Sequence, residues 1–277
     1  MKNIIKIFAV IIAAAFVSCE PVENRNGLSG RVTQAEIEQH IKVETEMRNG
    51  VRSNFLLIDS EGLNALTIFE HGMGSYIGKK ARVMGFVVPG DHVIKVHILN
   101  RDGSRDSKEI NVTVDECFDL HPAWDIFWGE SGSKTWTWDD QQSGEVVFGN
   151  GGYRVDNGPA WWRVPIEAPP PPGTGDLVPG EGRGATMTFK KGAVMTKERT
   201  NGTSETGDFI LDMTQTISGW SIGKVNFTNT TVLLGTNQDA YSFDILKLTE
   251  TEMVLASAPE GTAGGGPAFF WMFRAVE

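Results

Sequence analysis

The stretch FDILKLTETEMVLASAPEGTAGGGPAFFWMFRA, residues 243–275, decides which fold we predict for the C-terminal half of the chain. Two apolar runs flank Thr249-Glu250-Thr251, which predicts two strands joined by a tight turn. A glycine-rich loop then leads to a last strand that is apolar on both faces. By the period of two, its apolar residues are Phe269, Trp271 and Phe273 on one face and Phe270 and Met272 on the other. We expect such a strand at the centre of a sheet.

A β-strand pattern extends back from this stretch over most of the C-terminal half. The strand candidates are residues 145–149, 184–190, 207–212, 242–248, 252–257 and 268–274. No segment shows a long helical period, so we predict that residues 116–277 form an all-β domain. We expect a jelly-roll-like β-sandwich, with a closed lipocalin-like barrel as the alternative. The proline- and glycine-rich residues 167–184 are predicted to be a surface excursion, because four consecutive prolines cannot occupy a central strand. An interdomain linker is the alternative.

Residues 33–115 are predicted to form a separate N-terminal β domain. Thr33 is a helix N-cap candidate with Glu36 three residues later, which predicts one short helix over residues 33–41. After it, HVIKVHIL (residues 92–99) and SKEINVTV (residues 107–114) alternate between apolar and polar side chains. The loop between them contains Asp-Gly, a pattern typical of a β-hairpin.

The first 18 residues, MKNIIKIFAVIIAAAFVS, have the pattern of a secretory signal peptide. Lys2 and Lys6 precede an apolar run that has about half the ~20 residues of a membrane-spanning helix. The run ends in Phe-Val-Ser-Cys19, which resembles the lipobox of bacterial lipoproteins, where the cysteine is acylated and becomes the first residue. We therefore expect lipid attachment at Cys19, and residues 19–32 as a tether to the outer membrane.

The formal net charge of −10 argues against two classes of partner. Nucleic acids and anionic lipid headgroups both attract proteins through Lys and Arg. The expected contact with the membrane is therefore through acyl chains. The chain has one other cysteine, Cys117, and with Cys19 acylated no intramolecular disulfide is available. Cys117 is expected to be a small buried hydrophobe.

Residues 124–162 hold six of the eight tryptophans of the chain, in a frame rich in glycine, asparagine and aspartate. A sugar presents an apolar C–H face that stacks on an indole ring, and hydroxyl groups that need planar hydrogen-bonding partners. Trp161 and Trp162 are adjacent and point to opposite sides of an extended segment, so we expect one of them to be exposed, together with Trp138. The candidate glycan-binding residues are Trp138, Trp161, Trp162, Tyr153, Asp139, Asn157 and Arg163.

The sequence contains no HExxH, CxxC, Gly-x-Ser-x-Gly or P-loop motif. We therefore expect no catalytic activity, no metal and no other cofactor. A polysaccharide hydrolase or lyase is an alternative, since a glycosidase needs only two carboxylates across a cleft. Glu145 and Asp244, on separate predicted strands, are such a pair in principle.

Residues 88–114, VPGDHVIKVHILNRDGSRDSKEINVTV, resemble the last two strands of a PKD domain. That family typically has a Pro-Gly turn before the penultimate strand and ends on an alternating Val/Thr strand. The resemblance implies that residues 33–115 fold as an immunoglobulin-like β-sandwich, of a type that serves mostly as a spacer or a binding platform.

Four further features resemble a recurring arrangement in surface lipoproteins of the Bacteroidetes that begin with a lipobox and a PKD-like domain. They are Lys-Thr-Trp-x-Trp at 134–138, Pro-x-Trp-Trp at 159–162, a Leu-Thr…Leu strand pair at 248–255 and the aromatic strand at 270–273. The family is grouped with the SusE/SusF-like, glycan-binding lipoproteins of polysaccharide-utilisation systems. The resemblance implies a cell-surface protein that captures a polysaccharide or oligosaccharide for uptake, together with a TonB-dependent transporter complex. The alternative is a structural or assembly lipoprotein of such a complex.

Overall fold

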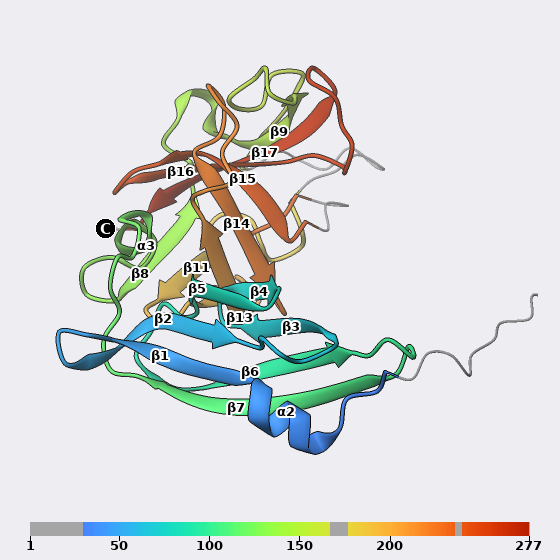
Figure 1. The fold of residues 1–277 in the computed structure, drawn as a ribbon. Helices are drawn as coiled ribbons and strands as arrows, with labels where there is room; N and C mark the ends of the chain where they lie inside the picture. Colours follow the sequence, from blue (N-terminus) through green and yellow to red (C-terminus); the bar gives the residue numbers. More distant parts are fainter. Residues whose placement is uncertain (1–29, 167–176, 236–239, 277) are drawn as a thin grey trace, which may run out of the picture. The chain divides into compact units, whose positions relative to one another are not determined.

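The computed structural model describes residues 30–166, 177–235 and 240–276 (Figure 1). These residues are organised almost entirely as β-strands, which confirms the predicted all-β class. None of their helices is long and apolar enough to cross a membrane. The predicted signal peptide, the lipid-attachment residue Cys19, most of the tether and the four prolines of the predicted excursion lie outside the described residues.

The chain divides into two compact units. The first comprises residues up to Glu44 together with Leu56–Val83 and Val93–Val112. The second comprises Thr45–Phe55, Met84–His92 and Thr113–Glu277. Several strands of the N-terminal half therefore run from one unit into the other.

Seven strands of the N-terminal half form two sheets. One has the order β1-β2-β5, with β1 at Lys42–Arg48, β2 at Val51–Asp59 and β5 at Lys80–Met84. The other has the order β4-β3-β6-β7, with β4 at Gly74–Ile77, β3 at Leu66–His71, β6 at Gly90–Leu99 and β7 at Arg105–Val114. Alternate residues of β6 are fully buried, which is the pattern of a sandwich. The adjacent β6 and β7 confirm the predicted hairpin.

The predicted helix is also present, as α2 at Gln34–His40. Thr33 caps it: the Glu36 backbone N–H donates to the Thr33 hydroxyl (3.3 Å), and the Thr33 backbone N–H donates to the Glu36 carboxylate (2.7 Å). This reciprocal pair satisfies two N–H groups that a helix start leaves open. The short capping pattern was therefore sufficient to locate this helix.

Eight antiparallel strands of the C-terminal half close into a barrel (Figure 1). Their order is β8 (Ser133–Trp138), β11 (Thr186–Lys190), β12 (Val194–Glu198), β13 (Ser204–Asp212), β14 (Gly223–Thr228), β15 (Ser242–Leu248), β16 (Glu252–Ser257) and β17 (Pro267–Ala275). The barrel closes because β17 pairs back with β8, with Phe273 opposite Trp138. The expected jelly-roll-like sandwich is thus wrong, because neighbours along the chain pair in sequence instead of crossing between two sheets. The structure agrees with the alternative in being a closed barrel.

Two further strands extend the sheet beside β17. β9 (Val146–Gly152) pairs with the first half of β17, and β10 (Trp162–Pro165) pairs with β9. The last residues of β17 pair with β8 instead. Strand β17 therefore has neighbours on both sides along its length, which confirms its predicted central position.

Aromatic side chains fill the inside of the barrel. They are Trp136, Trp138, Phe189, Phe209, Phe227, Phe243, Trp271 and Phe273, all buried. The short helix α3 (Ala123–Trp128) packs on this core, with the Phe127 ring 5.1 Å from that of Phe189 and 5.7 Å from that of Phe209. Such ring pairs add stability beyond the area that they bury.

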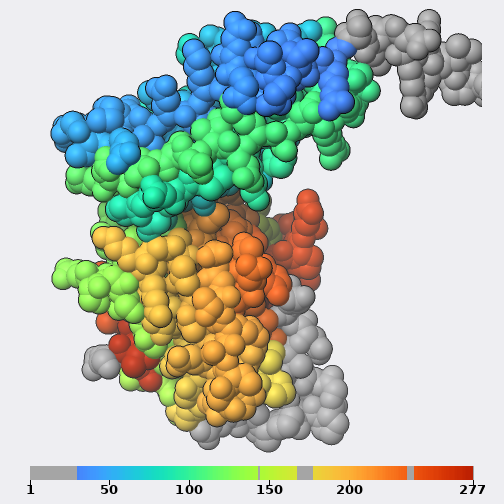
Figure 2. Space-filling view, turned by 90° about the horizontal axis from the view of Figure 1, so that it is seen from below, coloured from blue at the N-terminus to red at the C-terminus, as the bar shows by residue number. Residues whose placement is uncertain are grey.

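In Figure 2, the atoms of the strands coloured yellow to orange, β11 to β14, form a closely packed surface.

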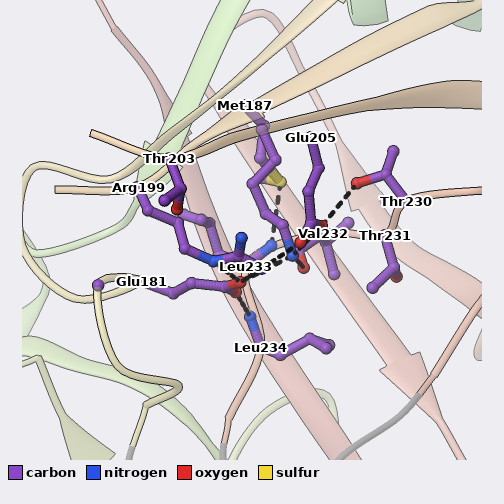
Figure 3. Close-up of polar contacts among 12 residues, drawn as sticks. Glu181, Met187, Arg199, Thr203, Glu205, Thr230, Thr231, Val232, Leu233 and Leu234 are labelled. Carbon is purple, nitrogen blue, oxygen red and sulfur yellow. Dashed lines mark hydrogen bonds and ion pairs between the residues drawn. The ribbon is translucent and has the colours of Figure 1, made fainter. Parts of the chain in front are cut away.

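A buried network of charged side chains ties a non-strand segment, residues 230–235, to the barrel wall (Figure 3). The Glu181 carboxylate lies 2.8 Å from the Lys197 ammonium and 2.7 Å from the Arg199 guanidinium. Its other oxygen accepts a hydrogen bond from the backbone N–H of Leu234 (2.7 Å). Glu205 is the second carboxylate of the network and also pairs with Arg199 (2.7 Å). Both oxygens of Glu181 are therefore satisfied, as a buried carboxylate requires.

Candidate functional site

Residues 153–161, which we call the Trp161 loop, fold back onto strand β9. Near its start, the backbone N–H of Gly152 donates to the Asp156 carboxylate (2.7 Å), and the Asp156 N–H donates to the Gly152 carbonyl (2.9 Å). At its end, the Trp161 N–H donates to the Asn150 carbonyl (3.0 Å). Hydrogen bonds to β9 thus hold the loop at both ends.

The glycines of β9 explain why the loop can lie so close. A Cβ atom on Gly149 would lie 2.9 Å from the Pro159 side chain of the loop and within 2.0 Å of the carbonyl oxygen of Trp162, where β10 begins, which no side chain can do. One on Gly151 would lie 2.9 Å from the Asp156 carboxylate. Gly149 and Gly151 are therefore required for the close packing of the following chain on β9.

The two adjacent tryptophans at the end of the loop have different environments. The Trp161 side chain is 57% exposed. Trp162 is partly buried, with its ring edge against Phe148 (5.8 Å between centroids, 82° between planes). This is the alternation expected for neighbours in an extended segment.

Trp138 does not belong to this surface, and the expectation that it presents an exposed indole face is wrong. It is fully buried and stacks on Phe273 (4.8 Å), and its ring N–H donates to the Glu181 carbonyl. The reason is the closure of the barrel. Strand β8 pairs with β17 where the barrel closes, and the face of β8 that carries Trp136 and Trp138 points into the barrel core.

Tyr153 begins the loop and is held between two other side chains. Its ring packs edge-on against Trp220 (4.9 Å, 80°), and the guanidinium carbon of Arg154 lies 4.8 Å from the Tyr153 ring centroid. Trp220 is buried against Ala256, Ala268 and Phe270 on the outside of the barrel. Sequence reasoning missed the role of Trp220, because it lies 58 or more residues from every other aromatic candidate and only the fold brings them together.

A cavity of about 760 Å³, which we call the Tyr153 pocket, lies beside the start of the loop. Its volume is in the range of small-molecule sites. Its polar and aromatic lining includes Tyr153, Arg154, Lys224, Tyr241, Asp244 and Glu260. Aromatic faces and charged groups of both signs are therefore available within one concave site.

Asp244 is the most unusual group of this pocket. Its side chain is buried, and burial raises the pKa of its carboxyl above the usual value, against the opposing charges of Lys224 and Arg154. Lys224, on the neighbouring strand, has its ammonium 3.7 Å from Oδ1 of Asp244. That oxygen has no hydrogen-bond partner within residues 30–166, 177–235 and 240–276.

A second cavity, of about 790 Å³, brings together two other predicted residues, Asp139 and Asn157, beside Trp220. Asp139 is buried, and its carboxylate accepts hydrogen bonds from the Gln142 side chain (2.6 Å) and the Gln141 backbone (3.3 Å). Both of its oxygens are thus already used within the chain. The loop residue Asn157 is exposed.

The remaining sequence candidates are dispersed. Arg163 is exposed on β10. Glu145 pairs with Arg183 (3.0 Å) and does not line the Tyr153 pocket, where Asp244 lies. Cys117 is half-buried, and burial raises the pKa of its thiol to about 11, so it stays a neutral thiol at physiological pH.

Within the described part of the chain, no three His, Cys, Asp or Glu side chains are grouped so that they could hold a metal ion. No protein-family model matches the sequence, and no curated protein matches it either. Function must therefore be inferred from the geometry around the Trp161 loop.

Proposed function

We propose that the protein binds an extracellular polysaccharide through the Trp161 loop, as a lipid-anchored protein of the outer membrane. The observation that carries the proposal is the exposed indole of Trp161 on a loop whose two ends are hydrogen-bonded to β9. A fixed aromatic face loses little conformational freedom when a sugar ring stacks on it. The exposed Asn157 and Arg163 supply hydrogen-bonding groups on the same loop and on the adjoining strand.

The other parts of the chain have supporting roles in this proposal. Acylation of Cys19 anchors the protein, and the N-terminal strands, as a PKD-like sandwich, space the barrel from the membrane. The barrel then delivers the captured chain to a TonB-dependent transporter complex. Replacing Cys19 with Ala should move the protein from the membrane fraction to the soluble fraction, and continued sedimentation of the variant with membranes would contradict the anchor.

An exposed tryptophan also suits a contact with another protein, because tryptophan is enriched at the energetic centres of such interfaces. This is the specific observation behind the second candidate function, a structural or assembly lipoprotein that touches no sugar. The two functions differ in whether the purified protein alone retains a polysaccharide. A binding assay without a partner protein therefore separates them.

The test is affinity electrophoresis of the full-length protein in gels that contain one polysaccharide each. Stacking on an aromatic face is worth ~1–3 kcal/mol, so Trp161→Ala should weaken binding by roughly 5- to 150-fold. Because Trp161 is exposed, the melting temperature of Trp161→Ala should stay close to that of the wild type. Trp162→Ala is the matched control, which should lower the stability instead. Retention of no polysaccharide by the wild type, or equal retention of Trp161→Ala, would overturn the proposal.

A further inference from the structure

Asp244 stands out because one of its carboxylate oxygens is buried without a hydrogen bond. Along β15 its neighbours Phe243 and Ile245 are buried on the inner side of the barrel, so Asp244 projects from the outer side into the Tyr153 pocket. Its exposed fraction is 5%, and Oδ1 has no hydrogen-bond partner in the part of the chain that the structure describes. A buried carboxylate in this state lowers the stability of the fold.

The barrel does not leave buried carboxylates unpaired as a rule. Glu181, which is fully buried, accepts from Lys197, Arg199 and the backbone of Leu234. Asp244 has an ammonium at 3.7 Å in place of such bonds. Asp244 also lines the Tyr153 pocket, so its carboxylate is placed to meet a ligand there.

Lys224 defines which chemical group fits beside that acceptor. Lys224 and Asp244 are directly opposite each other in the β14–β15 register. A hydroxyl group can donate to the carboxylate and accept from the ammonium at the same time. Two hydroxyls on adjacent ring carbons match a carboxylate and an ammonium placed side by side.

The rest of the lining favours a ring without charge. Tyr241 is 45% exposed and Tyr153 is partly exposed, so both offer aromatic surface in the pocket. The charged residues of the lining are two cations, Arg154 and Lys224, and two anions, Asp244 and Glu260. The formal charges of the lining therefore cancel, which favours an uncharged ring over a sugar acid.

We propose that the Tyr153 pocket is a sugar subsite distinct from Trp161, in which Asp244 and Lys224 bind adjacent hydroxyls of a neutral sugar ring. This inference rests on the proposed function, since it assigns a second contact to the same glycan. Tyr153 belongs both to the pocket and to the Trp161 loop, which gives one chain of sugars a route to both contacts. The ligand class that follows is a neutral polysaccharide.

The experiment compares four forms of the full-length protein by affinity electrophoresis: the wild type, Asp244→Asn, Lys224→Met and Asp208→Asn. Asp208 is an exposed carboxylate on the outer side of β13 and serves as the matched control. The gels contain α-mannan, a β-glucan, a galactan or polygalacturonate. The wild type should be retained by a neutral polymer in preference to polygalacturonate.

Loss of one charge-assisted hydrogen bond in the pocket should weaken that retention about 10- to 100-fold in Asp244→Asn and in Lys224→Met. The melting temperature of Asp244→Asn should rise, because the variant removes a buried charge that lacks a hydrogen bond at Oδ1. Asp208→Asn should change neither quantity. The losses of Trp161→Ala and Asp244→Asn should multiply in the double variant, as expected for separate contacts.

The outcomes separate this inference from the function on which it rests. If Trp161→Ala weakens binding and Asp244→Asn does not, the subsite is wrong and the function stands. A fall in the melting temperature of Asp244→Asn would make the carboxylate structural and overturn the subsite. Retention by polygalacturonate alone would overturn the neutral ligand, and retention by no polymer would overturn the proposed function itself.

Discussion

The indole N–H of Trp220 donates a hydrogen bond to the backbone carbonyl of Asp156, at 2.8 Å, across 64 residues of sequence. The Asp156 side chain in turn accepts from the backbone of Gly152. Trp220 thereby fixes the middle of the Trp161 loop to the outer face of the barrel, while β9 fixes its ends. The exposed position of Trp161 is a consequence of these three attachments.

Replacing Trp220 should show how much the loop depends on it. Trp220→Phe keeps most of the buried ring but loses the N–H donor, which should cost about 1 kcal/mol of unfolding free energy. Trp220→Ala also removes the packing and should cost ~3–5 kcal/mol. Both can be measured by denaturant unfolding. A loss of glycan affinity in Trp220→Phe, measured well below its melting temperature, would show that the loop acts through its fixed position, and unchanged affinity would contradict this.

Gly149→Ala should be strongly destabilising. Its new Cβ would collide with the Trp162 carbonyl, and backbone cannot move aside as a flexible side chain can, so we expect a loss of about 3 kcal/mol or more. Gly264→Ala is the control, because a Cβ there would have open space around it. The melting temperatures of the two variants measure the difference. Equal values would mean that the chain around Trp162 does not pack on β9 as described.

The Glu181–Lys197 pair should show strong coupling. Lys197→Met leaves Glu181 paired with Arg199 alone, and Glu181→Gln leaves Lys197 with Glu205 at 3.4 Å. Each variant therefore loses one buried charged contact and should cost about 1–3 kcal/mol. The double variant should be more stable than the sum of these two losses predicts, because both single variants lose the same Glu181–Lys197 contact. Denaturant unfolding of the three variants gives the coupling energy. Strict additivity would show that the two side chains do not interact.

Asp244 should make stability depend on pH in a defined direction. Its folded-state pKa is raised above 3.8, chiefly by burial. Below the unfolded-state pKa the carboxyl group is neutral in both the folded and the unfolded protein, so the full stability is present. As pH rises through the folded-state pKa the buried carboxyl group ionises, and that stability is lost. Asp244→Asn removes this loss, so the difference in melting temperature between the variant and the wild type should widen from pH 4 to pH 7. A difference that stays constant over this range would contradict a raised pKa.

Local sequence patterns determined the all-β class, part of the strand content and several details of this protein, whereas the barrel strands β12 and β14 were not among the predicted strands. The period of two placed β15, β16 and β17 and the two faces of β17, because side-chain alternation is a property of any extended chain. The capping pattern of Thr33 and Glu36 located α2, because a capping box also depends only on residues close together in the sequence. Adjacent tryptophans in an extended segment had to point to opposite sides, and it is Trp161 that is exposed.

The tertiary structure alone decided which strands pair across long distances. The pairing of Phe273 with Trp138 closes the barrel and makes Trp138 part of the core, and no local pattern specifies that partner. Distant pairing is selected by the total burial that it permits, set against the entropy of closing the chain, and both depend on the whole domain. For the same reason the sequence could show that Asp244 lies on a strand, but only the folded barrel places Lys224 beside it in a pocket with Tyr153.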